Sequence, residues 1–182
     1  MSRNTPGNNL AKLLKSTSNT FSLKDLGVLW DISNDKTLAT IVYRYAKKGY
    51  LYRLRKGIYS KFPFINLDYK EAGCAIFGSG AYLSTESVLV TYGVITQSIQ
   101  DHTFVGGLSQ SVKIGEESFL CRKMTSRYLF NRTGVIDGTN YSQASLERAV
   151  ADMLYYSPKY YFDTEKPINW DKVKEIKSLV GY

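Results

Sequence analysis

The sequence contains few of the residues that bind metals or perform acid–base catalysis. Its 182 residues include one histidine, His102, and two cysteines, Cys74 and Cys121. These are too few and too far apart for a tetrahedral zinc site, and a lone histidine does not supply the paired groups of a nucleophilic triad. The Gly-Ser-Gly turn at 78–80 lacks the third glycine of a dinucleotide loop and the lysine of a P-loop. We therefore expect no metal, no cofactor and no catalytic residue, and interpret the protein as a non-enzyme.

Long apolar runs are missing as well. No run approaches the roughly 20 residues that span a bilayer, and no charged start followed by an apolar stretch resembles a signal peptide. Both cysteines lie in apolar stretches, which is typical of reduced, buried thiols. We expect a cytoplasmic protein with no membrane partner, whose polar first nine residues fray.

Positive charge is concentrated in the first third of the chain. Residues 1–62 contain 12 Lys and Arg against Asp25, Asp31 and Asp35, a net charge of +9. Residues 63–182 contain 12 Lys and Arg against 13 Asp and Glu, a net charge of −1. This asymmetry indicates a basic module attached to a near-neutral body. Nucleic acid is the expected partner. The basic segment has the hydrophobic pattern of a folded module, which a membrane-binding tail would not need.

The basic segment has the element order of a winged helix-turn-helix. Ser22 is placed to cap a helix, with Asp25 as its capping-box partner, and Gly49 follows the last turn of another helix. Two β-prone runs around Lys56-Gly57 indicate a hairpin. We expect helices over 10–15, 23–30 and 35–48, a turn over 31–34, strands over 50–55 and 58–62, and a DNA-binding domain over 1–66.

The expected DNA-binding residues lie on two elements. The outer face of helix 35–48 and the hairpin supply Lys36, Thr37, Thr40, Tyr43, Arg44, Lys47, Lys48, Arg53, Arg55 and Lys56. The residues near the helix start are expected to reach base edges, the later lysines to reach phosphates, and the hairpin to follow the backbone or enter the minor groove. Charged residues on a single surface helix often do no more than keep its exposed face in water. Here the basic residues cluster on both the helix and the hairpin, which favours double-stranded DNA as the ligand.

Tyrosines interleave with these basic residues, at Tyr43, Tyr50, Tyr52 and Tyr59. Such interleaving is also found in proteins that stack RNA or single-stranded bases. Tyrosines in a hairpin over a helical core more often pack, with their hydroxyls in water. We favour packing and keep an RNA-binding accessory protein as an alternative.

Residues 67–182 are expected to form a C-terminal α+β domain with a small antiparallel sheet. Helices are predicted over 69–77, 85–92, 146–156 and 170–180, and strands over 102–105, 111–114, 118–121 and 134–137. Arg148 and Asp152 are spaced to pair on the outer face of their helix. The predicted fold class of the whole chain is therefore α+β.

Several segments resemble the AbiEi antitoxins, which belong to the abortive-infection, type IV toxin–antitoxin systems of bacteria. The segments are 21–26, 48–59, 81–93 and 144–154, in the order and spacing of that family. The sequence departs from the family pattern at Val88, where alanine is common, at Tyr92, where histidine is frequent, and at Leu146, where proline is frequent. The resemblance covers about residues 21–156.

The resemblance implies an antitoxin with two functions. Its winged helix would repress its own promoter by binding inverted repeats. Its C-terminal domain would counteract an AbiEii-like nucleotidyltransferase toxin without a stable complex. Arg148 and Asp152 are candidates for this second function, but we favour a structural ion pair at the helix surface as their explanation. The alternative is a stand-alone transcriptional regulator whose second domain senses a ligand or a partner.

Overall fold

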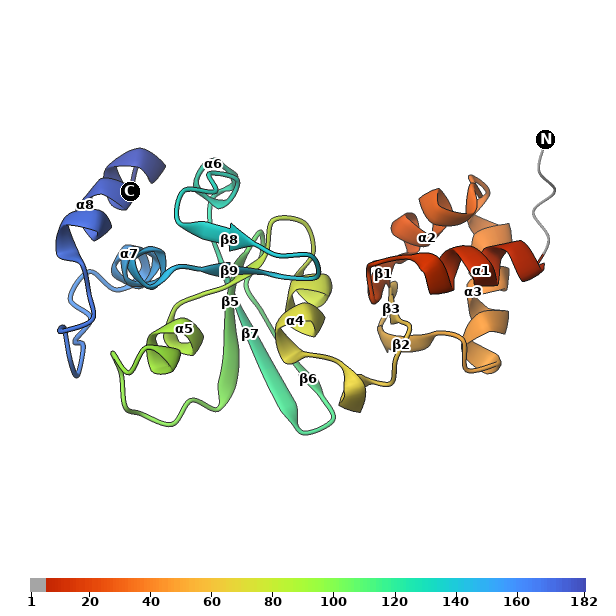
Figure 1. The fold of residues 1–182 in the computed structure, drawn as a ribbon, viewed down its shortest axis with the longest axis horizontal. Coiled ribbons are helices and arrows are strands. Elements are labelled where there is room, and N and C mark those ends of the chain that lie inside the picture. The colour runs from red at the N-terminus through yellow and green to blue at the C-terminus, as the bar shows by residue number, and fades with distance from the viewer. Residues whose placement is uncertain (1–5) are drawn as a thin grey trace. The chain divides into compact units, whose positions relative to one another are not determined.

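The computed structural model describes residues 6–182, which divide into two compact units, one ending at Asp68 (unit 1) and one beginning at Tyr69 (unit 2) (Figure 1). The boundary follows residue 68, where the sequence placed it after residue 66. The chain is mixed α+β, as expected, with a three-stranded sheet in unit 1 and a six-stranded sheet in unit 2. Within the described part of the chain, no helix is long and apolar enough to cross a membrane.

Unit 1 consists of helices around a small antiparallel sheet. Its elements are α1 (Pro6–Lys15), β1 (Thr20–Ser22), α2 (Leu23–Trp30), α3 (Asp35–Lys47), β2 (Tyr52–Arg55), β3 (Ile58–Ser60) and a 3₁₀ turn, η1 (Phe64–Asn66). The strand order is β1-β3-β2. Strand β1 was not expected, because three residues are too few to show a period.

Helix α1 starts earlier than predicted. Residues 6–9 were expected to fray, but the helix begins at Pro6. Proline is favoured in the first turn, because the backbone N–H that it lacks would have no partner within the helix there. The Trp30 indole N–H donates to the backbone oxygen of Asn9 at 3.0 Å and ties this turn to the core. Residues 1–5, also expected to fray, lie outside the described residues.

Local hydrogen bonds determine where α2 and α3 begin. The Ser22 side chain accepts from the Asp25 N–H at 3.1 Å while the Asp25 carboxylate accepts from the Ser22 N–H at 2.8 Å, which is the predicted capping box. Asp31 ends α2 in the left-handed conformation, with φ of 56°. Asn34 then caps α3 by accepting from the Thr37 N–H at 2.9 Å. These caps confine the connection between the two helices to a short turn.

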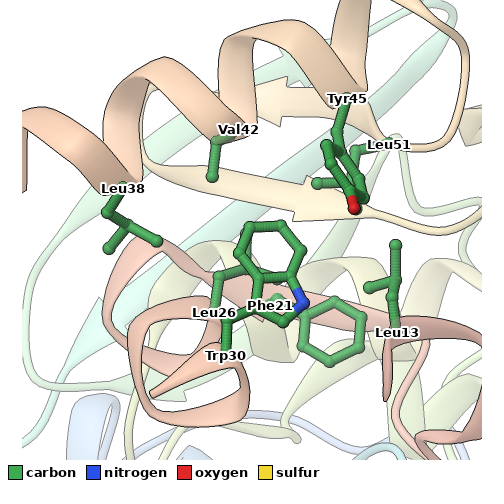
Figure 2. Packing of buried hydrophobic residues seen from close by; sticks show 8 residues of the cluster. All are labelled: Leu13, Phe21, Leu26, Trp30, Leu38, Val42, Tyr45 and Leu51. Carbon is green, nitrogen blue, oxygen red and sulfur yellow. The ribbon is translucent and has the colours of Figure 1, made fainter. Parts of the chain in front are cut away.

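The core of unit 1 forms around Trp30, which is fully buried (Figure 2). Its ring lies 5.1 Å from that of Tyr45, centroid to centroid. The other buried members of this cluster are Leu13, Phe21, Leu26, Leu38, Val42 and Leu51. Figure 2 shows the side chains of α3 directed down onto the Trp30 indole. One side of α3 is thereby committed to the core.

Unit 2 is built on a six-stranded mixed sheet. Its elements are α4 (Tyr69–Phe77), β4 (Tyr82–Leu83), α5 (Glu86–Thr91), β5 (Asp101–Gly106), β6 (Gln110–Ile114), β7 (Glu117–Lys123), α6 (Ser126–Leu129), β8 (Val135–Asp137), β9 (Ser142–Ala144), α7 (Leu146–Tyr156) and α8 (Trp170–Val180). The strand order is β6-β7-β5-β4-β9-β8.

The prediction of a small antiparallel sheet in unit 2 was wrong. Strand β7 returns from its hairpin with β6 and inserts beside β5, to which it is parallel, and β4 is parallel to β9. These pairings join segments far apart in the sequence, which periodicity does not reveal. Strands β4 and β9, of two and three residues, are also too short to predict.

Helix α4 packs closely on the sheet at Gly73. A Cβ at this position would meet the Phe104 ring at 2.1 Å, and Phe104 is fully buried. The glycine that weakened the helix prediction therefore has a packing function, because only hydrogen fits between helix and ring.

We predict that Gly73→Ala destabilises the protein by about 1–2 kcal/mol, because overpacking against Phe104 exceeds the helix propensity that alanine gains. Urea denaturation followed by circular dichroism measures this loss. Gly107→Ala is the control, because a Cβ there meets nothing closer than 4.0 Å. Equal stability of the two variants would contradict this account of the helix–sheet contact.

Candidate nucleic-acid interface

The outer face of α3 is exposed along its whole length. All the residues predicted on this helix are exposed, namely Lys36, Thr37, Thr40, Tyr43, Arg44, Lys47 and, at the C-cap, Lys48. The opposite face is buried through Leu38, Val42 and Tyr45. The helical period places Lys36, Thr40, Tyr43, Arg44 and Lys47 on one side, because their spacings are three or four residues. The structure thus brings most of the predicted residues onto one continuous surface.

The cationic side chains of α3 are available to an external anion. Within the described residues, Lys36, Arg44, Lys47 and Lys48 form no ion pair with a carboxylate. Asp25, which could have neutralised part of this charge, is engaged in the capping box of α2. The one carboxylate of α3 itself, Asp35 in its first turn, forms no ion pair with these cations among the described residues.

The β2–β3 hairpin supplies a second basic element. Arg53 and Lys56 are exposed and Arg55 is half-buried, while Leu54 between the arginines points into the core. The pairing with β3 shifts register between Arg53 and Arg55, and such a bulge re-aims the side chains around it. Gly57 closes the turn with φ of 82°, a conformation that favours glycine.

The tyrosines of this region divide into two groups. Tyr59 packs against the core cluster, and Tyr50 contacts the Tyr45 ring edge-on at 5.6 Å. Tyr43 was expected on the outer face of its helix as a DNA-binding residue, although packing was favoured for the tyrosines as a group; it is 67% exposed, because it lies on the side of α3 away from Trp30. Tyr52 is also exposed, and so is Tyr50 despite its contact with the Tyr45 ring. Tyr43 therefore belongs to the interface surface and not to the core.

Arg148 and Asp152 do not lie on a surface, which corrects their predicted position. Both side chains are 0% exposed, and the Arg148 Nε donates to Asp152 Oδ1 at 2.8 Å. The remaining guanidinium nitrogens donate to three backbone oxygens and to the Tyr82 hydroxyl, the latter at 2.8 Å. Every donor of the buried guanidinium has a partner, so this pair is a structural element of unit 2.

The Asp152 carboxylate is equally well satisfied. It accepts from the hydroxyls of Tyr82 at 3.0 Å, Ser84 at 2.7 Å and Tyr182, in addition to Arg148. Burial, followed by the charge of Asp152, raises the pKa of the Tyr82 hydroxyl, which therefore stays protonated as a donor. Burial alone would lower the pKa of Arg148, but the charge of Asp152 raises it. Sequence patterns give no signal for such a network, because its members come from four separate segments.

The remaining residues singled out in the sequence have structural surroundings. His102 Nε2 lies 2.7 Å from Glu117 Oε2, and the His102 ring stacks on Tyr69 with centroids 4.0 Å apart. Both cysteines are free thiols; Cys121 is buried and Cys74 half-buried. Burial raises the pKa of the Cys121 thiol to about 12. Over the described residues, no group of three or more His, Cys, Asp or Glu side chains is placed to hold a metal ion.

Comparison with known proteins adds no family. No protein-family model matches the chain, and no curated protein matches it. The likeness to AbiEi antitoxins therefore remains a resemblance of residues and spacing, and the geometry of unit 1 is the main basis for a functional proposal.

We predict that Asp152→Asn destabilises the protein by about 3–5 kcal/mol, because it leaves the buried Arg148 charge without its counter-ion. Urea denaturation of the purified variants measures the loss. The control is Asp171→Asn, which removes a carboxylate 3.5 Å from Lys174 in a surface pair whose side chains are mostly exposed. The control should unfold at the wild-type urea concentration. An Asp152→Asn variant as stable as the control would contradict the buried-pair account.

Proposed function

We propose that unit 1 is a winged helix-turn-helix module that binds double-stranded DNA. In this proposal α2, the turn ending at Asn34 and α3 form the helix-turn-helix, and the β2–β3 hairpin is the wing. The observation that carries the proposal is the continuous exposed face of α3, whose three basic side chains pair with no carboxylate in the part of the chain that the structure describes. A helix of about 10–12 Å diameter fits the major groove of B-DNA, which is about 12 Å wide.

The arrangement of charges suggests a division of roles. Lys36, Thr37 and Thr40 lie in the first half of α3, where recognition helices usually reach base edges. Arg44 follows one turn later and can bind a guanine or a phosphate. Lys47 and Lys48, at the end of the helix, are better placed for phosphates. Arg53, Arg55 and Lys56 of the wing would contact the adjacent backbone or the minor groove.

RNA is the second candidate ligand, because Tyr43 is exposed among basic residues. An A-form RNA duplex has a deep, narrow major groove that does not admit a helix. Recognition of RNA by α3 would therefore require an unpaired region that can stack on Tyr43. A gel-shift comparison of a DNA duplex with a structured RNA separates these ligands.

We further propose that the protein is a type IV antitoxin that represses its own promoter. This proposal rests on the resemblance to AbiEi antitoxins over about residues 21–156. In it, unit 1 binds inverted repeats of the promoter in the cytoplasm, and unit 2 counteracts an AbiEii-like nucleotidyltransferase toxin without a stable complex. Because Arg148 and Asp152 are buried, they would support the fold of unit 2 and not contact the toxin. A stand-alone regulator with a sensing second domain is the alternative, and a neighbouring nucleotidyltransferase gene would favour the antitoxin.

We predict that DNA binding weakens steeply with salt. If about six of the basic residues neutralise phosphates, the logarithm of the binding constant falls against the logarithm of salt concentration with a slope of about −5. Fluorescence anisotropy of a labelled duplex across a salt series measures this slope. An affinity that hardly changes between low and moderate salt would reject a phosphate-binding surface.

We also predict that repression and antitoxicity are separable. Lys36→Ala combined with Arg44→Ala should abolish promoter repression and leave toxin neutralisation intact, because the two activities are proposed for different units. A promoter–reporter assay and a growth assay with the toxin gene measure them side by side. Lys113→Ala with Lys166→Ala is the control, since it removes equal charge from exposed positions of unit 2. Loss of both activities in a folded Lys36/Arg44 variant would contradict the division.

The wing is expected to behave differently from α3. Replacing Arg53, Arg55 and Lys56 with glutamine should lower affinity for all duplex sequences by a similar factor, because backbone contacts do not distinguish bases. Competition between a selected duplex and a scrambled one measures this. A wing variant that loses preference for the selected sequence would instead assign base reading to the hairpin.

A further inference from the structure

Thr40 occupies the centre of the exposed face of α3. Lys36 and Arg44 lie one turn before and after it, and Tyr43 and Lys47 follow at three and seven residues, so all four border the same side of the helix. Thr40 is itself exposed, and so is Ala39 beside it. In the DNA complex proposed above, Thr40 would therefore be the residue most directly opposite the base edges.

The hydroxyl hydrogen of Thr40 is already used within the helix. Thr40 Oγ1 donates to the Lys36 backbone oxygen at 2.8 Å. Thr40 can therefore offer a base only its γ-methyl group and the remaining lone pairs of its oxygen. Guanine presents two acceptors, N7 and O6, in the major groove and needs donors. Contact through the γ-methyl group is therefore the interaction that leaves this helix hydrogen bond intact, and guanine presents no methyl group for it.

The surroundings of Thr40 distinguish the remaining bases. The exposed Tyr43 ring lies three residues after Thr40 on the same side of the helix, while Lys36 and Arg44 carry donors one turn before and one turn after it. The amino groups of adenine and cytosine can donate to the Thr40 oxygen, but neither base presents a methyl group to the Thr40 γ-methyl and the Tyr43 ring. Thymine presents a C5-methyl group beside the O4 acceptor, so its methyl matches the apolar centre and its O4 matches the cationic edge.

We propose that Thr40, with the Tyr43 ring, reads the C5-methyl group of a thymine in the bound DNA. The inference depends on the proposed DNA-binding function and adds the identity of one base. It assigns the contact to the methyl group of Thr40 and not to its hydroxyl.

The test begins with selection of bound duplexes from a random-sequence pool by the full-length protein. Each thymine of the enriched sequence is then replaced, one at a time, with deoxyuridine, which removes only the C5-methyl group. We expect a thymine position at which the replacement weakens binding about fourfold, the cost of failing to bury one methyl group. Replacement at the other thymines should leave the affinity near that of the parent duplex.

Two variants of Thr40 assign the contact. Thr40→Ser keeps the hydroxyl and loses the methyl, so its preference for thymine over deoxyuridine should fall well below fourfold, to what the Tyr43 ring alone contributes. Thr40→Val keeps a branched methyl and loses the hydroxyl, so it should retain the fourfold preference for thymine. Circular dichroism confirms that both variants remain folded.

Each outcome of the test has a definite meaning. Failure to bind any duplex would refute the proposed function itself. Binding without an enriched sequence, or an enriched sequence in which no thymine is sensitive to deoxyuridine, would overturn the thymine inference while preserving DNA binding. Retention of the full deoxyuridine effect in Thr40→Ser, or its loss in Thr40→Val, would overturn the assignment to the Thr40 methyl.

Discussion

Burial of the Trp30 indole beneath α3 determines which side of that helix remains in solvent. Leu38, Val42 and Tyr45 occupy the side of α3 that covers this indole, and the Tyr45 ring lies 5.1 Å from it (Figure 2). Because a helix has a fixed period, committing these positions to the core leaves Lys36, Thr40, Tyr43, Arg44 and Lys47 on the opposite side. The basic surface is thus a geometric consequence of the apolar core, and any rotation of α3 would bury charge.

Unit 2 is held together by a different kind of interaction. The Arg148–Asp152 pair joins α7 to β4 through Tyr82, to the segment after α6 through backbone oxygens, and to the end of the described chain through Tyr182. A buried ion pair contributes little net stability when compared with apolar packing, but removal of one partner is costly. The main role of the pair is therefore to fix how these segments are joined, and its net contribution to the free energy of unfolding is small.

Features that depend on neighbouring residues, such as helix caps, could be predicted from the sequence. Features that depend on contacts between distant segments, such as strand pairing and the burial of a helix face, could not. The capping box of Ser22 and Asp25 lies within one turn, and it was predicted correctly. Strand β9 exists only because β4 and β8 pair with it, so three residues without a period could not reveal it. Arg148 was predicted on the helix surface, because an amphipathic pattern is interpreted as a helix with one side in solvent. Helix α7 instead contacts α5, α8 and β9, and its Arg148 and Asp152 side chains are fully buried.

At the candidate interface, the sequence located the residues of α3, and the structure added their exposure, the engaged hydroxyl of Thr40 and the exposed ring of Tyr43. The central claim is that this face binds duplex DNA. Amide chemical shifts of the isotope-labelled full-length protein, recorded while a DNA duplex is added, test it most directly. The account predicts that the largest shift changes fall within residues 36–48 and 53–57. Changes confined to residues 69–182, or none at a DNA excess in low salt, would contradict it.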